Sequence, residues 1–268
     1  SLESSAGTFQ VTGTTTVSAA KTLSLSGSGT IALAASTISG TLTDTATLVD
    51  LTGTMTVQSS GSATVGSLLL EPGIGITNSG SFTASTGTIT TAGTGTVSTI
   101  TSSGSGTTSL AALSIPASTH NLTLSNTGTN AMTASGPVAV GAGRTLTITG
   151  TGSTVLSGTG ASQTTLDSGS TLTYTGTSSA TIADLLMAGS AVTSTGSGTL
   201  TLTSVSSSGA STMSTSTGLI QAGTLVVNSG SMALSGAGTY SIGGGTITGT
   251  LTDSSATTLT GDLTIAAA

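Results

Sequence analysis

The chain has 268 residues, a formal net charge of -6 at pH 7 and only 4% charged residues. Its two basic residues, Lys21 and Arg144, are too few to neutralise nucleic-acid phosphates, so we exclude a nucleic-acid partner. The absence of Cys excludes disulfides and thiolate metal sites, and no apolar run approaches the roughly 18 residues that predict a membrane-spanning helix.

The composition allows two interpretations, a disordered tract and a repetitive fold. Thr, Ser and Gly number 64, 48 and 40, and together they fill more than half of the chain. Such tracts are typical of flexible or heavily glycosylated segments. Against this, 35% of the residues are hydrophobic, the mean hydropathy is +0.41, and there are only 3 Pro. These values favour a chain that buries a core.

Segments in which apolar and hydroxyl residues alternate recur along the chain: TLSLS at 22–26, TLTIT at 145–149, TLTYT at 171–175 and TLTLT at 199–203. A period of two predicts strands with one buried face, and β-branched residues suit the extended backbone. Two runs, SLLLEPG at 67–73 and ADLLMAG at 183–189, interrupt the alternation. Because no segment shows sustained helical periodicity with caps, we expect an all-β chain.

The spacing of these segments indicates a solenoid. Their first apolar residues, counted from the middle of the chain, are Leu122, Leu146, Leu172, Leu200, Leu225 and Leu251. Successive positions differ by 24 to 28 residues, with Gly-containing corners such as SGSG between them, and such a period is typical of stacked coils. We therefore expect a right-handed parallel β-solenoid (β-helix) of about 10–11 coils, each with three short strands and stacked at about 4.8 Å.

A longer repeat links the two ends of the chain. The segment Gly27–Asp44 aligns without gaps with Gly236–Asp253, at an offset of 209 residues. We interpret residues 1–268 as a single solenoid segment that is a window of a longer tandem array or one unit of a polymer. Neither end shows a recognisable cap, and an open coil presents unpaired backbone groups. The expected partners are therefore other copies of the chain or adjacent repeats.

The low charge suits a closely stacked rod, because like charges repeated at about 4.8 Å would repel one another. The stretch GAGTYSIGGGTITGTL (Gly236–Leu251) resembles the repeats of autotransporter passengers and filamentous-haemagglutinin-type proteins, which are β-helical surface proteins of bacteria. The resemblance implies export, exposure at the cell surface, and a role as stalk, adhesin or filament.

The residues point to no catalytic, cofactor or metal site. His120 is the only His, and we expect it in the corner STHN. Asp44 and Asp253 occupy matching places in the long repeat, where we expect them to form turns through their carboxylates. A repeated calcium ligand is the alternative, although calcium needs several oxygen ligands. The remaining acidic residues are too scattered to pair from sequence.

Two surface features remain as candidates. Asn121 lies in the tripeptide NLT and is a candidate N-glycan acceptor, and the many exposed Thr and Ser could carry O-glycans. If the neighbouring Leu residues point inward, rows of Thr point outward and resemble the ice-binding face of some β-helical antifreeze proteins. These candidate ice-binding rows are Thr145 and Thr147, Thr171 and Thr173, and Thr199 and Thr201.

We therefore expect an extracellular or cell-surface structural protein, a fibre or filament without catalysis, assembled by end-to-end stacking of coils. The stalk of a bacterial surface adhesin and an ice-binding β-helix are the alternatives. No cofactor and no membrane span is expected; glycans are an additional candidate partner.

Overall fold

The computed structural model describes residues 1–46 and 48–266. They form an all-β parallel β-solenoid of about 13 coils, which confirms the expected fold class. One short 3-10 helix, η1 (Gly160–Ser162), interrupts the strands. The chain divides into two compact units, unit 1 (Ser1–Ser135) and unit 2 (Gly136–Ala268).

A complete coil in either unit contains three strand segments, two in a sheet that we call sheet A and one in a second sheet, sheet B. In unit 1, sheet B contains β3 (Thr15–Val17), β6 (Ser36–Ile38), β9 (Met55–Val57), β12 (Ile76–Asn78), β14 (Ser98–Ser102) and β16 (Leu122–Asn126). Sheet A of unit 1 contains β1 (Leu2–Glu3), β2 (Thr8–Val11), β4 (Thr22–Ser26), β5 (Thr30–Leu33), β7 (Thr41–Asp44), β8 (Leu48–Leu51), β10 (Ser62–Val65), β11 (Leu68–Leu70), β13 (Ser81–Thr91), β15 (Thr107–Ile115) and β17 (Met132–Ala134).

Unit 2 repeats this anatomy. Its sheet B contains β19 (Thr145–Gly150), β22 (Thr171–Tyr174), β24 (Ala191–Ser194), β26 (Ala210–Thr215), β28 (Ser231–Ser235) and β31 (Thr250–Asp253). Its sheet A contains β18 (Val138–Val140), β20 (Thr154–Leu156), β21 (Thr164–Leu166), β23 (Ser179–Ala188), β25 (Thr199–Ser208), β27 (Leu219–Val227), β29 (Thr239–Ile242), β30 (Gly245–Ile247), β32 (Ala256–Leu259) and β33 (Leu263–Ile265).

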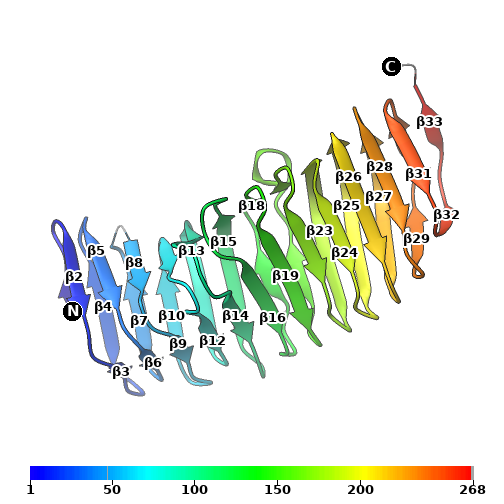
Figure 1. Ribbon diagram of the computed structural model, residues 1–268. Helices are drawn as coiled ribbons and strands as arrows, with labels where there is room; N and C mark the ends of the chain where they lie inside the picture. The colour runs from blue at the N-terminus through cyan, green and yellow to red at the C-terminus, as the bar shows by residue number, and fades with distance from the viewer. Residues whose placement is uncertain (47, 267–268) are drawn as a thin grey trace. The chain divides into compact units, whose positions relative to one another are not determined.

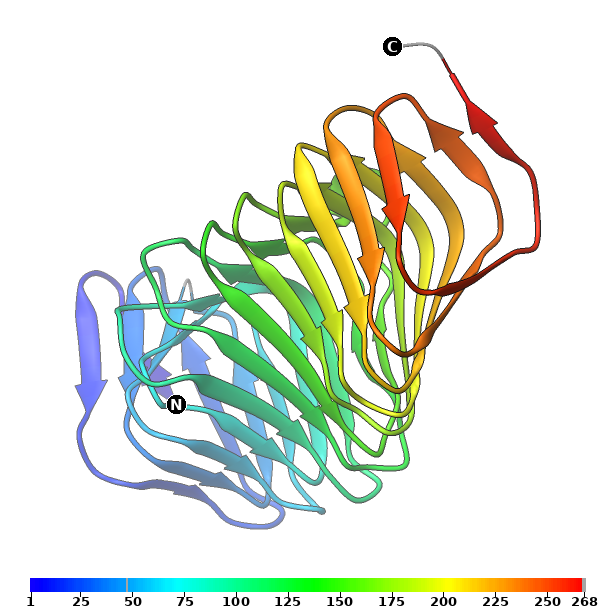
Figure 2. The ribbon, with the colours of Figure 1, turned by 45° about the vertical axis from the view of Figure 1, so that its right-hand side comes forward.

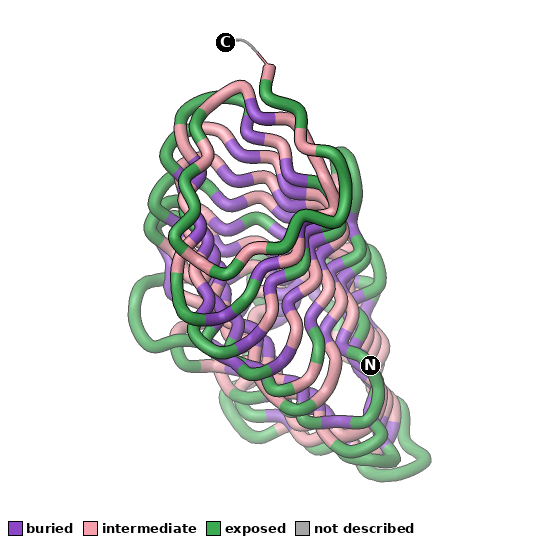
Figure 3. Tube along the Cα trace, turned by 90° about the vertical axis from the view of Figure 1, so that its right-hand side faces the viewer, coloured by how far each residue is buried: buried purple, intermediate pink, exposed green. Residues whose placement is uncertain are grey.

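Along each strand, the apolar residues point into the coil and the hydroxyl residues between them point outward. In unit 1, strands β3, β6 and β9 lie side by side (Figure 1), and their inward residues Val17, Ile38 and Val57 stack in register. In unit 2, the fully buried Leu172 stacks on Val192 in the same way. Figure 3 shows the result in unit 2, where buried and half-buried positions alternate along the strands of the windings before the last one. Apolar side chains thus form ladders along a thin core, and hydroxyl side chains cover it.

Glycine is required where neighbouring coils approach closely at a corner. A Cβ atom on Gly198 would lie 1.7 Å from the carbonyl oxygen of Ser178, on the preceding coil, and 2.3 Å from the hydroxyl oxygen of Tyr174. No side chain fits at this distance, so the tight stacking of these windings (Figure 2) depends on Gly198.

The coils are shorter and more numerous than predicted. Paired residues on neighbouring coils lie between 17 positions apart, as for Thr239 and Ala256, and 26 apart, as for Thr145 and Thr171. The prediction was wrong because its anchor residues do not share one ladder. Leu172 and Leu251 lie in sheet B, four coil steps apart, whereas the predicted anchors between them lie in sheet A. Three longer coils were therefore inferred where four shorter ones exist.

The long repeat also lies differently from expectation. Its two TLTD segments are β7 in sheet A and β31 in sheet B. An offset of 209 residues therefore does not correspond to a whole number of coils. The two sequences match, but they occupy different sides of the coil.

Candidate functional site

The two repeat-related aspartates form turns, as predicted. The backbone N–H of Ala46 donates to Asp44 Oδ1 at 2.6 Å, and that of Ser255 donates to Asp253 Oδ1 at 2.9 Å. Each carboxylate thus accepts a bond from the residue two positions on, the usual Asx geometry. Among the residues that the structure describes, no group of three His, Asp or Glu side chains could hold a metal ion.

The two aspartates differ in electrostatics because they differ in burial. Asp44 is 9% exposed and also accepts the N–H of Gly66 at 3.0 Å. Burial raises its pKa, and the hydrogen bonds only partly oppose this effect. Asp253 is exposed; desolvation is the largest single influence on its pKa and raises it, but the hydrogen bonds from Ser255 and Thr257 together outweigh this effect and lower the pKa. Asp253 is therefore firmly ionised near neutral pH.

A third acidic residue, Asp50, lies on the outer side of β8 between Ala32 and Leu69. Its Oδ1 is buried and has no hydrogen-bond partner among the described residues. Burial raises the pKa of Asp50, and repulsion from the Glu71 carboxylate raises it further. The two carboxylates therefore repel each other, and Asp50 is the one whose charge is opposed by burial.

His120 lies in the corner between β15 and β16, as predicted, but it is only 1% exposed. Its Nε2 lies 2.7 Å from Ser98 Oγ, and its Nδ1 lies 2.9 Å from the carbonyl oxygen of Ala92. Because a carbonyl only accepts, Nδ1 carries a proton. Ser98 is fully buried, so this Ser–His pair does not meet solvent. The hydrogen bonds of His120 link this corner to the preceding coil.

The predicted Thr rows are only partly assembled. Thr145 stacks on Thr171, and Thr147 on Thr173, all on the outer side of sheet B. The third predicted pair, Thr199 and Thr201, lies on β25 in sheet A and stacks on Ser179 and Thr181. The third pair does not continue the stack of the first two, because the TxT pattern occurs on strands of both sheets.

A more regular hydroxyl surface lies in unit 1, and the sequence reasoning missed it. We call it the hydroxyl face. It has two outward hydroxyl residues on each of five successive coils: Thr22 and Ser24, Thr41 and Thr43, Ser62 and Thr64, Ser81 and Thr83, and Thr107 and Ser109. A search for two hydroxyl residues separated by one position would have found this surface. It requires that Ser be treated as equivalent to Thr.

Asn121 directly precedes β16 and is half-buried. Its carbonyl oxygen accepts the N–H of Ser98 at 3.2 Å. Thr123 of the same tripeptide lies on the outer side of β16, stacked on Thr99. Glycosylation at Asn121 stays a prediction.

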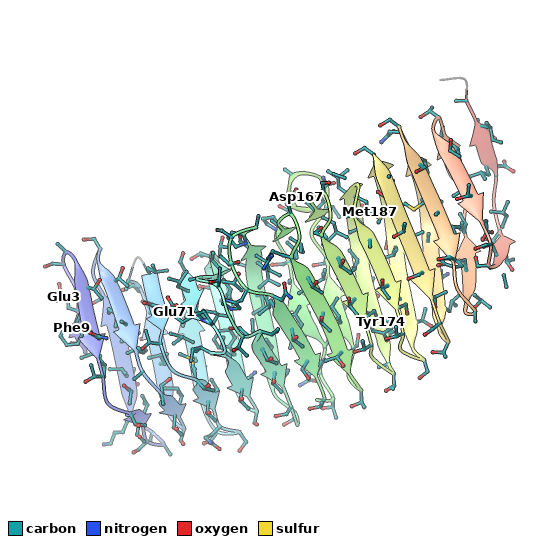
Figure 4. The ribbon with its side chains drawn as sticks, viewed as in Figure 1. Glu3, Phe9, Glu71, Asp167, Tyr174 and Met187 are labelled. Atoms are coloured by element: carbon teal, nitrogen blue, oxygen red, sulfur yellow. The ribbon has the colours of Figure 1, made fainter. Side chains whose placement is uncertain are left out.

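Exposed large apolar side chains lie on the first coil, on the last coil and in the loop between β13 and β14. In the described part of the chain they are Phe9 at 41% exposure, Val97 at 42%, Leu259 at 52% and Ile265 at 82%. Figure 4 labels Phe9 and Glu3, both on the first coil of unit 1. An open hollow of about 720 Å³ lies there, lined by Leu2, Phe9, Val11, Val17, Lys21 and Leu23 among others.

Comparison with protein-family models, with curated proteins and with solved structures found no match to this chain. In the described ranges, no helix is long and apolar enough to cross a membrane.

Proposed function

We propose that the chain is a structural protein of the cell surface or extracellular space, a β-solenoid rod segment without catalytic activity. The observation that supports this most is the register of like residues from coil to coil within each unit. Val17, Ile38 and Val57 stack in unit 1, and Leu172 and Val192 in unit 2. Such ladders bury a continuous core along the stacking direction, so each coil is stabilised by its neighbours.

The composition and the resemblance of one segment support a location outside the cell. Lys21 and Arg144 are the only residues after which trypsin-like proteases could cut. The resemblance of Gly236–Leu251 to β-helical surface proteins of bacteria also supports export. Either a filament or the stalk of an adhesin is consistent with this role, and the complete open reading frame would distinguish them by the presence of a separate adhesive domain.

Localisation in the source organism tests the proposal. An antibody raised against the chain should label the cell surface or the medium, and deletion of the gene should remove rod-shaped surface material seen by negative-stain electron microscopy. Exclusive recovery from the cytoplasm, or unchanged surface material in the deletion strain, would overturn the proposal.

A second candidate function, ice binding, is favoured by the hydroxyl face of unit 1. Its hydroxyl and methyl groups are held at the fixed spacing of strands, about 4.8 Å from coil to coil, and neighbouring hydroxyls bond to one another, as Thr43 does to Ser24 at 3.3 Å. Thermal hysteresis of the purified chain tests this function. We expect Thr64→Lys to abolish it and the matched control Thr173→Lys in unit 2 to retain it; the reverse result would assign it to the Thr145–Thr173 rows.

A further inference from the structure

One corner of unit 1 joins three successive coils through polar contacts; we call it the His120 corner, formed by Glu71, Ala92, Ser98 and His120. His120 Nδ1 lies 2.9 Å from the carbonyl oxygen of Ala92, and its Nε2 lies 2.7 Å from Ser98 Oγ. Ser98 Oγ lies in turn 3.0 Å from the carbonyl oxygen of Glu71. Glu71 follows β11, Ala92 follows β13 and His120 follows β15, and these three strands stack in that order. The contacts therefore form one line across three coils.

This line has more contacts than a neutral histidine can supply with protons. Its two ends are carbonyl oxygens, which only accept, so the three contacts need three protons. A neutral imidazole carries one N–H and the Ser98 hydroxyl carries one O–H, so one contact stays without a proton in either tautomer. In an imidazolium, Nδ1–H donates to Ala92, Nε2–H donates to Ser98 Oγ, and the Ser98 hydroxyl donates to Glu71. Only the protonated ring completes the line.

The neutral ring is nevertheless compatible with the fold. When Nε2 carries no proton, the Ser98 hydroxyl can donate to it and release the carbonyl of Glu71. That carbonyl still accepts the N–H of Ile74 at 3.0 Å, so it keeps a donor. Beside the line, the hydroxyl groups of Thr91 and Thr119 bond to each other at 2.7 Å, a link between the same coils without a titratable group. The corner therefore has two bonded states that differ by one proton and one hydrogen bond between coils.

The charges of unit 1 near this corner favour the protonated ring. Strands β12 to β16 carry no charged side chain, and Glu3, Lys21 and Asp44 lie on earlier coils. A Cβ atom on Gly93, the residue after Ala92, would lie 3.6 Å from Glu71 Oε2, so this carboxylate lies beside the corner. Asp50, whose carboxylate is repelled by that of Glu71, adds a negative charge from the preceding coil. Burial opposes a cation, but fixed acceptors on both ring nitrogens and nearby negative charge offset this cost.

We propose that His120 takes up a proton in mild acid and thereby tightens this corner, so that unit 1 is held together more strongly near pH 5 than near pH 8. The folded chain places two acceptors on the ring that the unfolded chain does not hold in position. Folding therefore favours the protonated ring, and by linkage the free energy of unfolding rises as the pH falls through the range in which the ring titrates. The inference builds on the proposed structural function, to which it adds a response to pH.

NMR of the ring nitrogens tests the proton count, because His120 is the only His and its signals are unambiguous. Between about pH 8 and about pH 5, the ring of the folded chain should change from the neutral Nδ1–H form to the doubly protonated form. Ser98→Ala should bind this proton about 10-fold more weakly, because a charge-assisted hydrogen bond is lost. The matched control Thr91→Val removes the neighbouring hydroxyl bond and should leave proton binding unchanged.

Denaturant unfolding tests the consequence for stability. Relative to His120→Gln, the folded-to-unfolded ratio of the wild type should rise about 10-fold between about pH 8 and about pH 5. The same comparison with Ser98→Ala provides a second measurement if His120→Gln fails to fold. Arg144→Gln removes the one basic side chain of unit 2 and should retain the doubly protonated ring in acid.

Several results would overturn the inference. These are a folded chain whose ring stays neutral at about pH 5, a wild type that loses stability relative to His120→Gln as the pH falls, and a Thr91→Val variant that weakens proton binding as much as Ser98→Ala does. Loss of the doubly protonated ring in Arg144→Gln would also contradict it, because the contacts that hold the proton lie within unit 1. None of these results bears on the proposed structural function, which the localisation experiment tests separately.

Discussion

Tyr240 couples the stability of unit 2 to alkaline pH. Its ring is 2% exposed, and its hydroxyl lies 2.8 Å from the carbonyl oxygen of Met213 and 2.9 Å from that of Ser235. Burial raises the pKa of Tyr240 to about 12, mainly because the phenolate would lose its hydration. Ionisation would also remove the proton that the hydroxyl donates to these carbonyls.

The size of the effect follows from the difference between the folded and unfolded states. The ordinary pKa of Tyr is 10.0, so the folded value of about 12 is higher by about two units, which corresponds to roughly 2.7 kcal/mol. Because the folded pKa is the higher one, this contribution is fully present below about pH 10. It is lost as the pH rises through about 12.

Denaturant unfolding measured between about pH 9 and pH 12 tests this reasoning. We expect Tyr240→Phe to be less stable than the wild type by about 1 kcal/mol near neutral pH, because a hydrogen bond is lost. Above about pH 10, however, the variant should lose less stability than the wild type. Burial also raises the pKa of Tyr174, so the double Phe variant should have the flattest profile. Equal alkaline losses in the wild type and Tyr240→Phe would refute the argument.

Three further substitutions probe packing and charge. Gly198→Ala should cost roughly 2 kcal/mol or more because its Cβ meets a backbone oxygen, whereas Gly13→Ala, with open space around it, should change the unfolding free energy by less than about 1 kcal/mol. Leu172→Ala should cost about 2–5 kcal/mol in thermal unfolding, from the cavity left in the core. Asp50→Asn should stabilise the fold by up to about 1 kcal/mol at neutral pH, since it removes an unpaired carboxylate beside Glu71. Because the folded pKa of Asp50 is raised, the wild type should gain stability as the pH falls through that value, and the Asn variant should lack this gain.

Much of the fold could be predicted from short segments of the sequence. A period of two specifies strand and assigns each residue to the inside or the outside, so the burial of Leu146 and Leu172 and the outward position of the Thr beside them could be predicted. The Asx turns at Asp44 and Asp253 could be predicted too, because a carboxylate and an N–H two residues on are local partners.

By itself, then, the sequence determined an all-β chain with an apolar inside and a hydroxyl outside, because alternation is a property of neighbouring residues. Only the tertiary structure decided which strand stacks on which. Leu172 and Leu200 stand in the same local pattern, yet they belong to different sheets, because every side of a coil needs the same alternation and the corners vary in length. Coil length, the hydroxyl face and the contact between His120 and Ser98 all depend on pairing across a whole coil, where each residue's partner lies about 20 positions away.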